Sequence, residues 1–261
     1  MKTLASRDNP TFKELRELMR DARRQRTERR TLIEGPHLVA AALNHGMLPD
    51  LVAVSESGAV QSEVSEMLAR LATVPTVCLR DALFNEISEL AAPVGILARI
   101  AIPAVVTELP AGDCLLLDAV QDAGNVGTLL RTAAAAGVRD VLLGPGCAGA
   151  WTPRVLRAAQ GAHFALTIRE QADLPAFLRD YPGVSVATVA HDGASLYDLD
   201  CAGPLAWLFG NEGAGLAPEL LAAARRRVTI PLAAGSESLN VAAAAAICLF
   251  EMRRQRAGRR I

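Results

Sequence analysis

Three short loops in this 261-residue chain combine polar side chains with glycines, and each joins an apolar, strand-like segment to a helical one. Loops of this kind collect at one edge of an open parallel sheet, where ligands bind. Small polar side chains and backbone N–H groups at helix starts suit a polar or anionic ligand there. The loops cover Gln121–Arg131, Phe209–Leu216 and Ala233–Asn240.

The first loop, QDAGNVGTLLR, places Asn125 and Gly127 at the entrance of a helix and Arg131 about one turn inside it. On this spacing we expect Asn125 to cap the helix and Arg131 to reach an anion at the helix N-terminus. A capped helix that carries one surface arginine explains the same residues without a ligand.

The second loop, FGNEGAGL, has three glycines within six residues, directly after an apolar strand. Glycine lets a backbone come close to a ligand, and the polar side chains Asn211 and Glu212 lie at the tip of the loop. A tight turn without a function is the alternative interpretation.

The third loop belongs to Ile230–Glu251, IPLAAGSESLNVAAAAAICLFE. A short strand with Pro231 leads into small polar residues, and an alanine-rich helix begins at about Asn240. Because polar residues crowd its entrance and apolar residues follow, we expect a buried helix whose N-terminus faces a site. Plain N-capping by Ser238 and Asn240 explains the same residues equally well.

A fourth segment, Gly144–Gly149, fits the dinucleotide-binding pattern G-x-G-x-x-G and has Glu170 about twenty residues further on. Two features argue against that function. Pro145 lies in the turn itself, and the next helix begins only at Pro153, so the glycines do not open it. A nicotinamide oxidoreductase is therefore kept as the weakest alternative.

The segments that position these loops alternate between strand and helix, which predicts an α/β fold. We assign residues 1–102 to a small α/β unit, 103–112 to an extended proline-containing linker, and 113–261 to a second α/β unit with a parallel sheet. Strands are predicted at 31–34, 51–54, 76–79, 95–100, 114–117, 140–143, 164–168, 184–189, 205–209 and 228–230. Helices are predicted at 10–26, 36–44, 61–71, 82–90, 128–136, 153–160, 174–179, 218–224 and from about 240.

Positive charge is concentrated at the N-terminus. Residues 1–30 hold ten Lys or Arg against five Asp or Glu, whereas residues 31–112 hold three against nine. Arginine outnumbers lysine 25 to 2, and the forked guanidinium group suits phosphate. The basic run RDARRQRTERR, residues 20–30, is either a solvated helix face or a surface that contacts phosphates.

Several classes of protein are not supported by the sequence. The five cysteines are far apart and form no Cys-x-x-Cys or Cys/His cluster, so we expect neither disulfides nor a bound metal. The four histidines lie outside the three loops, which argues against acid–base chemistry through histidine. The start MKTLASRDNP lacks the apolar core of a signal peptide, and Val241–Phe250 is shorter than the roughly 20 residues of a membrane span. We expect a cytoplasmic protein.

Together, the three loops resemble the signature motifs of the SpoU/TrmH family of RNA ribose methyltransferases, a branch of the SPOUT knotted methyltransferases. Asp118–Gly137 is similar to the first motif, Leu208–Leu216 to the second and Ile230–Glu251 to the third, in the same order and spacing. The resemblance covers residues 113–261. The N-terminal unit is similar in size and pattern to the ribosomal-protein-like RNA-binding domain that many members carry.

Two positions depart from the family pattern. Ala123 stands where the first motif commonly has proline, and Leu232 stands where the third motif often has methionine. Neither change removes a polar group that we assign to catalysis.

The resemblance implies a deep trefoil knot in the second unit, for which the alanine-rich helix would supply small packing side chains. It also implies that S-adenosylmethionine binds in the knot, largely through backbone groups, and that the protein is a homodimer with its active site at or near the interface. The implied cofactor contacts fall on Gly210, Ile230, Leu232 and Leu239.

The implied reaction is methylation of a ribose 2′-hydroxyl, in ribosomal RNA rather than transfer RNA. Arg131 matches the family's catalytic arginine, which we interpret as a phosphate anchor that stabilises the developing alkoxide. Asn125, Glu212, Ser238 and Asn240 would orient the loop, the ribose or Arg131. The N-terminal basic helix and its domain would hold RNA through phosphates. Transfer RNA as substrate, and a non-catalytic RNA-binding protein of the same fold, are the alternatives.

Overall fold

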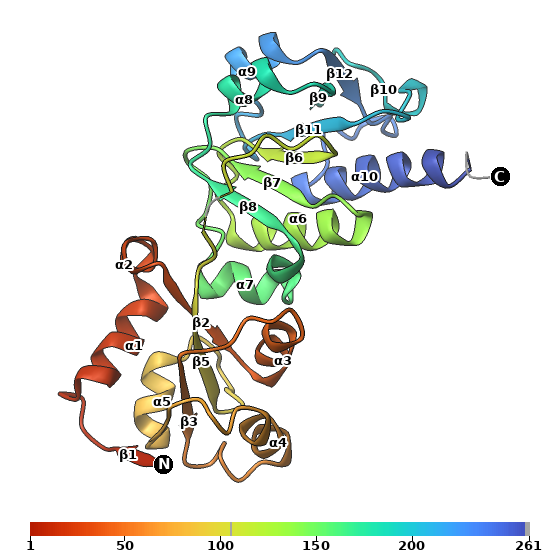
Figure 1. Ribbon diagram of the computed structural model, residues 1–261. Coiled ribbons are helices and arrows are strands. Elements are labelled where there is room, and N and C mark those ends of the chain that lie inside the picture. Colours follow the sequence, from red (N-terminus) through yellow and green to blue (C-terminus); the bar gives the residue numbers. More distant parts are fainter. Residues whose placement is uncertain (105, 259–261) are drawn as a thin grey trace. The chain divides into compact units, whose positions relative to one another are not determined.

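The chain folds into two compact units (Figure 1). The computed structural model describes residues 1–104 and 106–258, so Val105 of the predicted linker and the last three residues lie outside the described residues. One unit holds Met1–Ala104 and Trp151–Phe164, and the other holds the described residues of Val105–Ala150 and Ala165–Ile261. This division departs from the predicted one, because the sequence placed 151–164 in the second unit.

The first unit is built on a sheet with the strand order β1-β4-β3-β5-β2, in which β5 runs antiparallel to β2 and β3. Helices α1 and α5 cover one face of the sheet, and α3 and α4 cover the other (Figure 1). The strands are β1 (Lys2–Leu4), β2 (Arg30–Glu34), β3 (Leu51–Ser55), β4 (Thr76–Leu79) and β5 (Ile96–Ala101). The helices are α1 (Pro10–Arg20), α2 (Ala22–Glu28), α3 (Pro36–Asn44), α4 (Ser62–Arg70), α5 (Asp81–Ile87) and α7 (Pro153–Ala159).

Helix α1 buries one apolar face, as its sequence predicts. Phe12, Leu15, Leu18 and Met19 are buried in a core with residues of α5 and the sheet. The predicted helix 10–26 is divided into two helices, because the chain breaks at Asp21. Asp21 has an extended backbone, and its carboxylate accepts hydrogen bonds from the first backbone N–H groups of α2.

The segment Trp151–Phe164 is tied into the first unit by specific contacts. The Thr31 hydroxyl donates a buried hydrogen bond of 2.6 Å to the Trp151 carbonyl, and the Trp151 and His163 rings lie 5.1 Å apart. The predicted strand 164–168 was shifted: η1 (Ala162–Ala165) is a short 3₁₀ turn, and Phe164 lies beside the His45 ring. The apolar side chains of this segment therefore serve packing in the first unit.

The second unit is a parallel α/β sheet, as predicted, with the order β10-β12-β9-β11-β6-β7-β8. Its strands are β6 (Cys114–Leu117), β7 (Asp140–Leu143), β8 (Thr167–Glu170), β9 (Val184–Thr188), β10 (Ala194–Ser195), β11 (Leu205–Phe209) and β12 (Arg226–Thr229). Its helices are α6 (Ala123–Ala136), α8 (Leu174–Asp180), α9 (Pro218–Ala223) and α10 (Val241–Ala257), with a short turn η2 (Leu196–Asp198).

Helices cover both faces of this sheet (Figure 1). Helices α8 and α9 pack on the face that carries Leu208, whereas α6 and α10 lie together on the opposite face. Because side chains alternate along a strand, the neighbouring Trp207 points to α10, where its indole N–H lies 3.4 Å from Met252 Sδ. The described residues include no helix that is both long and apolar enough to cross a membrane.

Helix α6 begins earlier than the sequence predicted. It starts at Ala123 because the Asp122 carboxylate caps it, accepting a hydrogen bond of 2.7 Å from the Asn125 backbone N–H. The predicted N-cap role of Asn125 was therefore wrong, and its side chain is available for other contacts. Arg131 lies near the middle of the helix and not in its first turn.

Candidate active site

The three loops meet at the carboxyl ends of the strands, as predicted for an open parallel sheet. Strand β11 lies next to β6, and both lead directly into such a loop. Hydrogen bonds connect the loop after β6 to the loop after β11 and to the start of α10. Residues that are about 90 positions or more apart in the chain thereby form one site.

Glu212 anchors the loop after β6. Its carboxylate accepts a hydrogen bond of 2.9 Å from the Asn125 side-chain amide and longer ones, of 3.4 Å, from the backbone N–H groups of Gln121 and Asp122. Burial opposes ionisation of this carboxyl, but the hydrogen bonds outweigh it and hold the pKa of Glu212 below its ordinary value. Glu212 is therefore an anion that holds the start of α6 in place.

Asn125 and Asn240 join the starts of α6 and α10. The Asn240 amide donates a hydrogen bond of 2.9 Å to Asn125 Oδ1, while Asn240 Oδ1 accepts from the backbone N–H groups of Ala242 and Ala243. The Asn125 amide nitrogen, Nδ2, donates to the Glu212 carboxylate. A continuous chain, Glu212–Asn125–Asn240, thus runs through all three loops.

Asn211 shapes the loop after β11. Its backbone exchanges two hydrogen bonds with Gly215, and its side-chain oxygen accepts from the backbone N–H groups of Gly213 and Ala214 at 2.9 Å. Its amide donates to the Ala119 carbonyl at 2.8 Å, and Ala119 itself has a left-handed backbone, φ 52°. Asn211 therefore closes the turn and fixes it to the end of β6.

Gly210 allows the two ends of this turn to touch. A Cβ at this position would lie 2.3–2.4 Å from backbone atoms of Gly215 and Leu216. Since no side chain fits there, the glycine-rich sequence is required by packing within the loop as well as by any approach of a ligand.

A cavity of about 560 Å³ opens beside the chain of hydrogen bonds. Its lining includes the residues predicted to contact a cofactor, Gly210, Ile230, Leu232 and Leu239. It also includes Glu212, Ser238 and Asn240 from the predicted catalytic set. Leu239 is 38% exposed, so an apolar side chain faces the open space. The cavity therefore offers both apolar surface and small polar groups.

Two of the predicted catalytic residues, Ser238 and Arg131, are not part of the hydrogen-bonded chain Glu212–Asn125–Asn240. Ser238 lines the cavity but does not cap α10, since Asn240 provides the cap. Arg131 is exposed on α6 and is not among the residues that line the cavity, and its side chain has no hydrogen bond or ion pair within the part of the chain that the structure describes. Arg131 is thus available to an external anion.

The segment after β9 adds lining residues that the sequence analysis did not single out. Thr188 and His191 line the cavity together with Val189 and Ala190. The Thr188 hydroxyl is buried and lies near the Cys248 thiol. His191 lies outside the three loops, as the sequence shows, yet it lines the same cavity. The sequence did contain a signal for this segment. Residues 184–189 were predicted as a strand of the same sheet, and the residues at the end of such a strand lie at the same edge.

The glycine segment 144–149 does not form a dinucleotide site. The backbone N–H of Gly144 donates to the Leu117 carbonyl, and that of Ala148 donates to the Val120 carbonyl, so the segment packs beside the end of β6. Helix α7 begins only at Pro153, as the sequence indicated. The glycines do not open a helix, which the phosphate-binding geometry requires.

The fold and the cavity define a class: an α/β protein that binds a small molecule at the carboxyl edge of a parallel sheet. Comparison with known families is more specific. Residues 114–250 match the SpoU rRNA Methylase family, and residues 9–98 match the MRM3-like substrate binding domain. The chain therefore belongs to the SpoU rRNA methylase family.

Relatives of known sequence and structure agree with this membership. The chain is 34% identical to the 23S rRNA (guanosine(2553)-2′-O)-methyltransferase RlmP of Bacillus subtilis, over 97% of this chain and 100% of that protein. It is 31% identical to the mitochondrial rRNA methyltransferase 3A of Danio rerio, over 87% of this chain and 64% of that protein. It is also similar to the SpoU methyltransferase AviRb from Streptomyces viridochromogenes in complex with AdoMet, with a TM-score of 0.87, 25% identity, and coverage of 95% of this chain and 98% of that one.

Proposed function

We propose that this protein transfers a methyl group from S-adenosylmethionine to a ribose 2′-hydroxyl of ribosomal RNA, with 23S ribosomal RNA as the first substrate to test. The hydrogen-bonded chain Glu212–Asn125–Asn240 at the edge of the cavity carries the proposal, because it connects all three motif loops. The relative from Bacillus subtilis, which this chain covers in full, supports ribosomal RNA over transfer RNA.

The cavity fits S-adenosylmethionine. Its volume of about 560 Å³ lies in the range of roughly 300–1,000 Å³ that is usual for small-molecule pockets. Apolar side chains of Ile230, Leu232 and Leu239 suit the faces of an adenine ring. When bound, the cofactor supplies an electrophilic methyl group.

The residues of this chain would then position the acceptor. A ribose hydroxyl is a weak nucleophile, so it must be held in line with the methyl group and stabilised as it loses its proton. Glu212 and Asn125 hold the start of α6 in place, and Asn240 fixes α10 relative to it. Ser238, exposed at the cavity, is suited to contact the ribose.

Arg131 would anchor an RNA phosphate and stabilise the developing alkoxide. Its exposed guanidinium supports this role, as it has no competing ion pair among the described residues. We further propose a homodimer that places this arginine at or near the subunit interface. Phe250 is 47% exposed on α10, the helix that packs against α6, which carries Arg131.

We also propose a deep trefoil knot in residues 113–261, supported by the similarity of the whole chain to solved SpoU methyltransferases. The N-terminal unit, residues 1–102, would bind the RNA, which its match to a substrate binding domain supports. The residues 103–112 would act as the linker. A cytoplasmic location remains a proposal that rests on the sequence alone.

Mapping of 2′-O-methyl groups in total RNA, with and without the gene, tests the proposed function. We expect one ribosomal RNA site to lose its methyl group in the deletion strain and to regain it when the gene is restored. Loss at a transfer RNA site would establish the alternative substrate. An unchanged map, together with no binding of S-adenosylmethionine by calorimetry, would favour a non-catalytic RNA-binding protein.

A further inference from the structure

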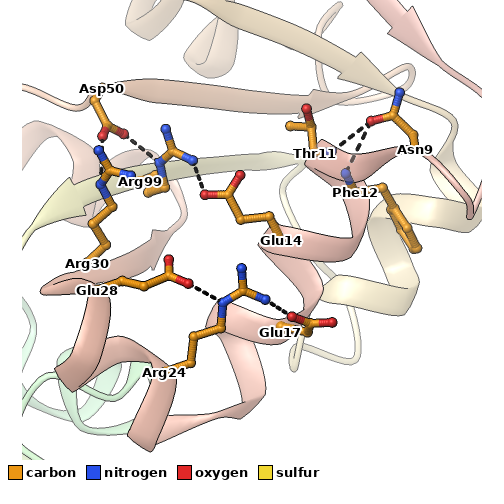
Figure 2. Close-up of polar contacts among 10 residues, drawn as sticks. All are labelled: Asn9, Thr11, Phe12, Glu14, Glu17, Arg24, Glu28, Arg30, Asp50 and Arg99. Atoms are coloured by element: carbon orange, nitrogen blue, oxygen red, sulfur yellow. Dashed lines mark hydrogen bonds and ion pairs between the residues drawn. The ribbon is translucent and has the colours of Figure 1, made fainter.

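The charged side chains of α1 lie on two sides of the helix. On the first side, Glu14 and Glu17 form ion pairs with arginines. Figure 2 shows the Glu17 and Glu14 side chains pointing toward arginines of the same unit. Arg24 pairs with Glu17 and with Glu28, and Arg99 pairs with Glu14. These ion pairs balance the positive charge on this side of the unit.

The basic run 20–30 therefore has less free charge than its sequence suggests. Besides Arg24, Arg30 is paired through its Nε, which lies 3.2 Å from the Asp50 carboxylate (Figure 2). The Arg29 guanidinium donates to the carbonyl groups of Ile102 and Pro103. In α2 this leaves Arg23 and Arg26 as exposed arginines whose side chains form no ion pair within the described residues.

The second side of α1 carries an excess of positive charge. Arg7 donates to both Glu86 carboxylate oxygens, with Nε–O distances of 2.8 and 3.0 Å. Arg20 donates to the Glu86 backbone carbonyl at 2.7 Å, and the Arg16 guanidinium lies 5.5 Å from the centre of the Phe12 ring. We call Arg7, Arg16 and Arg20 the arginine triad.

Arg7 thus pairs with the Glu86 carboxylate, and Arg20 contacts the backbone carbonyl of the same residue. The hydrogen bond from Arg7 lowers the pKa of Glu86, and the charges of Arg7, Arg16 and Arg20 lower it further despite partial burial. Glu86 can neutralise one of them, which leaves two positive charges in excess. The Arg7 side chain is 69% exposed, so the surplus faces solvent.

The chemistry of this surface fits a phosphate backbone. Guanidinium groups bind phosphate through two parallel hydrogen bonds. The large apolar side chains that are exposed in the described chain include none from α1 or α5, so the surface lacks the apolar centre usual at a protein interface. Nucleic-acid interfaces are, by contrast, polar and positively charged. The buried Phe12 ring also restricts where the Arg16 guanidinium lies.

We propose that the arginine triad binds phosphates of the substrate RNA. This inference rests on the proposed function, and it assigns the phosphate contacts of the N-terminal unit to the face formed by α1 and α5. Contacts of this kind position RNA without reading its sequence.

Two matched double variants of the full-length protein test the proposal. The probe is transcribed 23S ribosomal RNA, with binding measured over a range of salt concentrations. For Arg16→Gln with Arg20→Gln we expect binding roughly tenfold weaker at about 0.1 M salt, with a log–log salt slope shallower by about 1.5. Arg23→Gln with Arg26→Gln should keep the wild-type slope. Equal losses in the two variants would overturn the proposal.

A third variant predicts a gain. Glu86→Gln removes the carboxylate that occupies Arg7, so RNA should bind more tightly and the slope should steepen by about 0.7–0.9. Unchanged or weaker binding by a variant that keeps wild-type S-adenosylmethionine affinity would count against the triad. The wild-type protein separates the two proposals. If it neither binds nor methylates the transcript, the proposed function fails; if it does both and the triad variants behave like it, this inference alone fails.

Discussion

The amide nitrogen and the amide oxygen of the Asn240 side chain make two different contacts. Its amide nitrogen donates a hydrogen bond of 2.9 Å to Asn125 Oδ1, whereas its oxygen caps α10. The first contact connects two motif loops, and the second stabilises a helix. Because they use different atoms, substitution can remove one and keep the other.

We predict that Asn240→Asp lowers methyl transfer while the protein stays as stable as wild type. Aspartate accepts the same capping hydrogen bonds but cannot donate to Asn125. The misplaced loop should cost roughly tenfold to hundredfold in the single-turnover rate. Asn240→Ala, the control, should also lose about 1 kcal/mol of unfolding free energy with its cap. Wild-type turnover by the aspartate variant would exclude a role for the bridge between the asparagines.

Two glycines in the loop after β11 should differ in how well they tolerate substitution by alanine. A Cβ at Gly210 would overlap backbone atoms at 2.3–2.4 Å, whereas one at Gly213 would have its nearest neighbour at 3.6 Å. We expect Gly210→Ala to cost about 1–3 kcal/mol or more in unfolding free energy and to abolish S-adenosylmethionine binding. Gly213→Ala should keep both properties. Thermal unfolding and calorimetry measure the two effects, and equal behaviour of the variants would contradict the packing argument.

Arg131→Ala should abolish methyl transfer and leave S-adenosylmethionine binding largely intact. The reason is that Arg131 is not among the residues lining the cavity but is exposed to an incoming RNA phosphate. Arg139→Ala, which removes another exposed arginine shortly after the end of α6, serves as the control and should remain active. Retained turnover by the Arg131 variant would reject its assignment.

Glu251 should make the unfolding free energy depend on pH in the acid range. Hydrogen bonds from Arg254 and Gln255 lower the pKa of this carboxyl from its ordinary value of 4.5 to about 2. The folded state therefore favours the ionised form, so its stabilisation is fully present above pH 4.5 and declines as the pH falls toward 2. Denaturant titrations between pH 5 and 3 should show a shallower decline for Glu251→Gln than for wild type. Glu219→Gln, exposed on α9, should follow the wild-type curve.

The residue pattern alone predicts the alternation of strands and helices and the positions of most of them. Strands 76–79, 114–117, 140–143 and 205–209 and helix 36–44 were predicted at their observed bounds. This succeeded because buried strands are short continuous apolar runs, and because Pro36 marks a first helical turn. Strands β1 and β10 were missed, since three and two residues are too few to form a pattern.

The contacts of each polar residue depend on the fold. Asn125 and Asp122 are both residue types that suit an N-cap. The sequence does not show that Asp122 caps the helix while the Asn125 side chain donates to Glu212 on another loop. The same holds for charge: the run 20–30 looked like one basic patch, but Arg30 is neutralised by Asp50, which its local sequence does not identify as a partner. Propensity and periodicity are local properties, whereas hydrogen bonds and ion pairs depend on which distant segments the fold brings into contact.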